Sequence, residues 1–162
     1  MKLALASDHA GFRLKESVKE YLTSQRYEFD DFGTQSEEAV DYPDYGFPAA
    51  EAVARGECDR GILICGSGIG MSMLANRISG IRAALCTSVT MAEFSRSHND
   101  ANVLVLGERI TDKESALEIV KVWLSTSFEG GRHQQRLDKI TAYERVQPLR
   151  PEPLESERSV IC

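Results

Sequence analysis

The chain has 162 residues and a formal net charge of −6, with the apolar and charged fractions of an ordinary globular protein. No basic run stands out, which argues against a protein that binds nucleic acid or a membrane surface. No apolar run approaches the ~20 residues that span a bilayer, and the first residues lack the apolar core of a signal peptide. We expect one domain over residues 1–146, followed by an extended tail over 147–162 that holds three of the five prolines.

Short apolar runs alternate with longer amphipathic ones. The apolar runs predict strands over 2–6, 27–32, 61–65, 81–86 and 103–106. The amphipathic segments predict helices over 11–24, 43–56, 68–78, 88–97 and 131–144, and one more that begins at a capping box, Thr111-x-x-Glu114. Because parallel strands need crossover connections, we predict an α/β three-layer sandwich: a five-stranded, mostly parallel sheet with helices on both faces. Its ligand site is expected at the carboxyl ends of the strands.

The four cysteines are scattered, without Cys-x-x-Cys pairs. This pattern is typical of reduced thiols in a cytoplasmic protein, and it predicts neither disulfides nor a metal site.

The stretch ICGSGIGM, residues 64–71, joins a strand-end cysteine to a glycine-rich turn. It is not a dinucleotide fingerprint, because the third glycine is misplaced and the next strand ends without an acid. It lacks the lysine of a P-loop, and Met71 stands where a phosphatase loop would need arginine. What remains is a turn into a helix, whose free N–H groups would stabilise an anion and favour the thiolate of Cys65.

A thiolate beside such a turn suits removal of a proton next to a carbonyl, since negative charge then develops on oxygen. The alternative is that Cys65 is only a small apolar residue at the end of a buried strand.

Three further polar groups are candidates for ligand contact. Asp8 and His9 end the first strand, although Asp8 could simply cap the next helix. His98 lies in a loop, where a histidine is commonly a solvated surface group. Arg132 and Arg136 share a helix face and could grip one phosphate, or form a solvated stripe. His133 points about 100° away from Arg132 on the same helix, so we do not include it. Together these groups suggest a small phosphorylated substrate with a carbonyl.

Five blocks of the sequence resemble the ribose-5-phosphate isomerase type B family, which also holds the allose-6-phosphate and galactose-6-phosphate isomerases. They are SDHAG (7–11), DYPDY (41–45), ILICGSGIGMSMLANRISGIRAAL (62–85), SRSHNDANVLVLGERI (95–110) and GGRHQQR (130–136). The resemblance covers about residues 2–145. It implies a Rossmann-like sheet in a homodimer, which could pair into a tetramer, with sites built from both subunits and no metal or organic cofactor.

The resemblance also assigns roles by position. Cys65 would be the base that moves a proton between C1 and C2, and His98 the acid in furanose ring opening. Asp8 would hold substrate hydroxyls and assist that opening. Ser67 stands where many members have Thr, and it keeps the hydroxyl. The implied substrate-binding set is Asp8, His9, Tyr42, Gly66, Ser67, Gly68, Ile69, Gly70, Met71, Asn99, Arg109, Arg132 and Arg136.

Within that set, the turn Gly66–Met71 would bind the enediolate, and His9 with the arginines would bind phosphate. Asn99 and Arg109 are expected from the partner chain. The expected reaction is interconversion of ribose 5-phosphate and ribulose 5-phosphate, in the pentose phosphate pathway, through a cis-enediolate. The alternatives are an isomerase of allose 6-phosphate or galactose 6-phosphate, and a sugar-phosphate sensor without catalysis. A sensor would be expected to lack the base or the ring-opening acid, and both Cys65 and His98 are present.

Overall fold

A computed structural model describes residues 1–146 and shows five strands in one sheet. In chain order the strands are β1 (Lys2–Ser7), β2 (Glu28–Asp31), β3 (Arg60–Cys65), β4 (Ala83–Leu85) and β5 (Val103–Gly107). The order across the sheet is β2-β1-β3-β5-β4, and all four neighbouring pairs are parallel. The α/β arrangement predicted from the sequence is confirmed, with a sheet that is parallel throughout.

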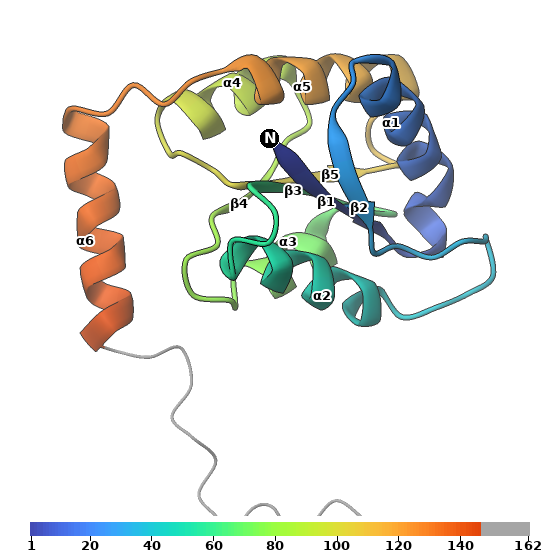
Figure 1. Ribbon diagram of the computed structural model, residues 1–162, viewed down its shortest axis with the longest axis horizontal. Helices are drawn as coiled ribbons and strands as arrows, with labels where there is room; N and C mark the ends of the chain where they lie inside the picture. Colours follow the sequence, from blue (N-terminus) through green and yellow to red (C-terminus); the bar gives the residue numbers. More distant parts are fainter. Residues whose placement is uncertain (147–162) are drawn as a thin grey trace, which may run out of the picture.

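The helices lie on both faces of this sheet (Figure 1). They are the 3₁₀ turn η1 (His9–Gly11), α1 (Phe12–Ser24), α2 (Tyr42–Ala54), α3 (Ile69–Ala75), α4 (Val89–Ser97), α5 (Lys113–Ser125) and α6 (Arg132–Val146). No helix within residues 1–146 is long and apolar enough to cross a membrane.

The two faces of the sheet differ because alternate residues of each strand point to opposite sides. Large side chains such as Leu3 and Leu5 of β1 pack with α1, α4 and α5. On the other face Ala4 and Ala6 pack with α2 and α3. Small side chains there let α2, with its own buried alanines, approach the sheet closely. This close layer carries the glycine-rich turn and Tyr42 to the edge of the sheet.

Two local predictions are wrong. Asp112 rather than Thr111 caps α5, since the Asp112 carboxylate accepts the N–H of Ser115 at 2.9 Å. An aspartate at the N-cap satisfies a free helix N–H at least as well as a threonine. The helix after the glycine-rich turn ends at Ala75, because the Asn76 side chain bonds both the N–H and the C=O of Ala83 and so turns the chain into β4.

Helix α6 stands beside the edge strand β4, apart from the other helices (Figure 1). Its buried residues are His133 and Leu137, one turn apart. The tail predicted for 147–162 lies outside the described residues.

Candidate active site

A cavity of about 370 Å³ opens at the carboxyl ends of β1 and β3. The chain order of the strands changes direction between these two strands, which is where parallel sheets place their ligands. The cavity is lined by Asp8, His9, Ala10, Tyr42, Cys65, Gly66, Ser67, Gly70, Arg109 and Ile110. The structure thus gathers the predicted base, Asp8, His9 and much of the glycine-rich turn in one place.

Cys65 is the last residue of β3 and is 5% exposed. Its Sγ accepts a hydrogen bond from the backbone N–H of Gly68 at 3.2 Å. A donor aimed at sulfur stabilises the thiolate more than the thiol. Gly68 can make this bond because its φ is +78°, and a Cβ there would lie 2.4 Å from Cδ1 of Leu85. Glycine is therefore required at 68 both by backbone conformation and by space.

The rest of the turn offers further donors. The N–H of Ile69 bonds the Ser67 hydroxyl at 3.3 Å. The N–H groups of Gly70 and Met71 lie in the first turn of α3, where a helix has no carbonyl of its own to bond them. Tyr42 lies flush against this backbone, since a Cβ at Gly70 would be 2.9 Å from its Cζ. Met71 is fully buried, so it can contribute only its backbone to the site.

Asp8 both caps a turn and lines the cavity, so the two interpretations of this residue are compatible. Its Oδ1 accepts the N–H groups of Ala10 and Gly11, both at 3.0 Å. Burial raises the pKa of the Asp8 carboxyl above its usual range, although the charges of His9 and Arg109 and the two hydrogen bonds oppose the shift. A carboxylate with a raised pKa is a stronger base than an ordinary aspartate.

His9 lies at the rim of the same cavity. Its Nδ1 is 3.2 Å from the N and 3.1 Å from the O of Val40. When Nδ1 accepts the Val40 N–H, the ring proton is on Nε2 and can be donated to an anionic ligand.

Arg109 lines the same cavity as Cys65 of its own chain, whereas the resemblance placed it on the partner. The segment after β5 folds back over the turn, with N–H bonds from Glu108 to the Cys65 carbonyl (3.0 Å) and from Arg109 to the Gly66 carbonyl (2.9 Å). A Cβ at Gly66 would be 3.3 Å from Nε of Arg109. An exposed cation thus lies next to Gly66, the residue that follows Cys65.

His98 and Asn99 are not brought to this cavity within one chain. They follow α4, which runs back from the carboxyl end of β4 toward the amino end of β5. Asn102, a few residues on, bonds the N–H of Gly61 near the start of β3, whereas Cys65 ends that strand. The length of β3, roughly 16 Å, therefore separates the two regions.

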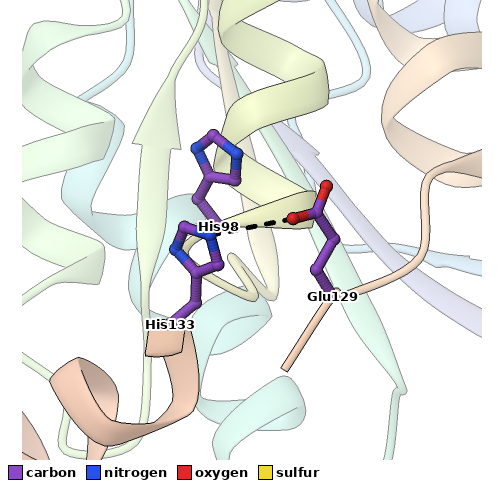
Figure 2. A group of neighbouring side chains, drawn as sticks. All are labelled: His98, Glu129 and His133. Carbon is purple, nitrogen blue, oxygen red and sulfur yellow. Dashed lines mark ion pairs between the residues drawn. The ribbon is translucent and has the colours of Figure 1, made fainter. Parts of the chain in front are cut away.

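The predicted site does not include His133, yet this residue lies against His98 (Figure 2). The two rings stack with centroids 4.3 Å apart and 3° between their planes. His133 is 5% exposed, and burial lowers its pKa, with the charges of His98 and Arg132 acting in the same direction. The sequence does contain a pattern that indicates this burial of His133. Leu137 follows it by four residues, so the two side chains share one face of α6, which is the buried face.

Arg132 and Arg136 are both exposed on α6, one helical turn apart. They do not line the Cys65 cavity. A second cavity of about 330 Å³ lies between α6 and the β4 edge, and its lining includes Asn99, Leu137 and Ile140. Its lining includes the carboxylate of Glu144 but no thiol and no residue of the glycine-rich turn, so the Cys65 cavity is the better candidate for chemistry.

Comparison with known proteins gives one consistent result. Residues 3–140 match the Ribose/Galactose Isomerase family. Ribose-5-phosphate isomerase B of Escherichia coli is 50% identical over 143 residues, which are 88% of this chain and 96% of the relative. The structure of ribose-5-phosphate isomerase B from Clostridium thermocellum superposes with a TM-score of 0.88 at 53% identity, covering 90% of this chain and 99% of that one.

A third relative was solved with a ligand. The enzyme of the same name from Mycoplasma genitalium, crystallised with bound ribulose 5-phosphate, superposes with a TM-score of 0.85 at 41% identity and covers 89% of this chain and 96% of that one. The resemblance found in the sequence is therefore confirmed, and this chain belongs to the ribose/galactose isomerase family, a family of sugar-phosphate isomerases.

Proposed function

We propose that this chain interconverts ribose 5-phosphate and ribulose 5-phosphate through a cis-enediolate, with Cys65 as the base. The observation that carries the proposal is the sulfur of Cys65 at the cavity, bonded by the Gly68 N–H and next to the turn that begins α3. The names of relatives near 50% identity support the five-carbon substrate.

The isomerisation moves two protons, one from C2 to C1 and one from O2 to O1. The Cys65 thiolate removes the proton from C2 of the open-chain aldose, a C1=C2 double bond forms, and the electron pair of the carbonyl moves onto O1. The O2 proton must also reach O1, and the Ser67 hydroxyl at the cavity can both accept and donate it. Return of the proton from the Cys65 thiol to C1 then gives the ketone at C2.

The enediolate is stabilised by backbone donors. The N–H groups of Gly70 and Met71 point out of the first turn of α3 with no helix carbonyl to bond, so they are free to donate to O1 or O2. Loss of one donor of this kind commonly costs about 3 kcal/mol of transition-state stabilisation. His9 and Arg109 would bind the phosphate group at the rim of the same cavity.

Ring opening requires groups that one chain cannot supply at this cavity. The anomeric hydroxyl must lose a proton, which suits Asp8 with its raised pKa, and the ring oxygen must gain one. His98 is the proposed donor, but it lies near the amino ends of the strands of its own sheet, whereas the cavity lies at their carboxyl ends. We therefore propose a homodimer in which His98, Asn99, Arg132 and Arg136 reach the cavity from a second copy.

The surface near β4 is suited to such an interface. Exposed apolar side chains lie on α3 and α4, the helices that precede and follow this edge strand, and they are Ile69, Met73, Val89, Met91 and Phe94. Large apolar side chains exposed on both helices next to an edge strand are suited to a contact with another protein.

The function is tested by a direct assay. The purified chain is expected to convert ribose 5-phosphate to ribulose 5-phosphate with a higher kcat/KM than it shows for allose 6-phosphate or galactose 6-phosphate. A reversed preference would replace the five-carbon substrate by a six-carbon one. Binding of all three without turnover would favour a sensor.

A further inference from the structure

We propose that His133 is a positioning residue that holds the ring of His98 in the orientation needed for proton transfer. The inference rests on the proposed function, because it concerns how the ring-opening acid is kept in place.

The ring of His98 lies between two flat side chains. On one side is Phe94, with centroids 4.6 Å apart and 12° between the planes. On the other is His133, at 4.3 Å and 3° (Figure 2). A half-buried histidine at a helix end would otherwise rotate among several side-chain conformers. Two parallel neighbours leave one plane for the ring, so only its nitrogens remain open to a ligand.

His133 is itself held from several directions. Its Nε2 is 3.7 Å from Oε2 of Glu129 and 3.5 Å from Nε of Arg132. The N–H of Glu129 donates to the carbonyl of Ser97 at 3.0 Å, which fixes the start of α6 against the end of α4. The segment that carries His133 is therefore bonded to the residue next to His98.

Burial and the surrounding charges favour a neutral His133. Burial disfavours its protonated form, as do the charges of His98, Arg132 and Arg136, while Glu129 opposes them. Nearby Arg96 is already paired with Asp100 at 2.8 Å. A neutral His133 supports the His98 ring without placing a positive charge against it.

The same side chains also resemble a metal site, since ligand atoms of His98, Glu129 and His133 lie within 4.8 Å of one another. The stacking argues against this. A histidine lone pair lies in the plane of its ring, so the lone pairs of two stacked rings lie in two nearly parallel planes that do not meet at the site. Zinc needs nitrogens that converge on one point at about 2.0–2.1 Å.

The test compares His133→Ala with His133→Phe in the full chain, using ribose 5-phosphate. The alanine variant is expected to lower kcat about tenfold or more, because a misplaced general acid loses part of the 10²–10⁴-fold that such a group commonly contributes. KM is expected to stay within about twofold of wild type. The phenylalanine variant keeps a flat ring and is expected to recover most of kcat. Thermal unfolding of both variants identifies any loss that comes from misfolding.

A double-mutant cycle separates positioning from general stability. If His133 acts through His98, adding His133→Ala to His98→Ala lowers kcat no further. Additive losses, or a His133→Ala variant with wild-type kcat, would overturn the inference while leaving the isomerase activity in place. Loss of wild-type activity in EDTA, restored by zinc, would replace it by a metal site.

A spectroscopic readout does not depend on turnover. The chain has only three histidines, so their ring protons can be followed individually by NMR. The His98 signals are expected to shift in His133→Ala, through loss of the neighbouring ring current, and to return toward wild type in His133→Phe. Unchanged His98 signals in the alanine variant would contradict the stack even if the wild type proved to have no isomerase activity.

Discussion

The two ends of strand β3 differ in how their functional groups are held. At the carboxyl end, Cys65 and Asp8 are buried and bonded to backbone N–H groups of their own chain. At the amino end, His98 is half-buried at the end of α4 and is held by stacking against Phe94 and His133. The groups of the first region are held by their own backbone, whereas the second region presents side chains outward. This contrast suggests that proton abstraction belongs to one chain and ring opening to a pair.

Cys65→Ala should have the largest effect. Removal of the base is expected to lower kcat by about 10³-fold or more, because general bases commonly contribute 10²–10⁴-fold and the cavity lining offers no other thiol. KM should change little, since the sulfur does not bind the phosphate. The measurement is steady-state turnover of ribose 5-phosphate, with Cys86→Ala as the matched control at a buried cysteine outside the cavity. A Cys65→Ala enzyme within tenfold of wild type would remove this residue from the role of base.

Mixing two inactive variants tests whether the regions meet across a dimer. Cys65→Ala and His98→Ala chains, refolded together in equal amounts, should recover about a quarter of wild-type activity, because half of the dimers are mixed and each mixed dimer has one intact site. The control is each variant refolded alone. A mixture no more active than the sum of its components would argue that the two regions do not share a site.

Arg109→Gln should have an intermediate effect confined to the carboxyl end. Loss of a charge-assisted bond to phosphate is expected to raise KM about tenfold or more, with kcat much less affected, because ground state and transition state both carry the phosphate. Arg13→Gln, at an exposed arginine paired with Glu37, is the matched control. An unchanged KM would place the phosphate elsewhere.

Asp8→Asn should give the smallest effect, on stability. The pKa of Asp8 is raised in the folded protein, so the folded state binds this proton more tightly than the unfolded state. Binding of this proton stabilises the folded state at a pH below the ordinary carboxyl pKa. This stabilisation is lost as the pH rises through the raised pKa of the folded state. Relative to Asp8→Asn, the wild type should therefore lose unfolding free energy over that window. Urea unfolding at pH 3 to 7 measures the difference, and a gain with rising pH would contradict the sign.

Much of the site could be predicted because its groups are close to strand ends. The glycine-rich turn, the cysteine before it and the Asp-His pair after β1 each lie where a parallel sheet places ligand-binding groups. Arg109 was assigned to the partner because sequence does not show that the segment after β5 folds back onto Gly66. The angle of His133 from Arg132 around the helix places it off the arginine face, whereas its spacing to Leu137 indicates the buried face of α6.

The sequence by itself determined the α/β fold with its mostly parallel sheet and the family, and it predicted a role for Cys65. These depend on local patterns: apolar runs, the glycine spacing and residues that follow strand ends. Only the tertiary structure decided which groups share a cavity, that Arg109 lies next to Gly66, and that His98 stacks between Phe94 and His133 near the amino ends of the strands. The physical reason is that contacts between segments far apart in the chain depend on how loops return and which helix faces are buried, and neither leaves a local pattern.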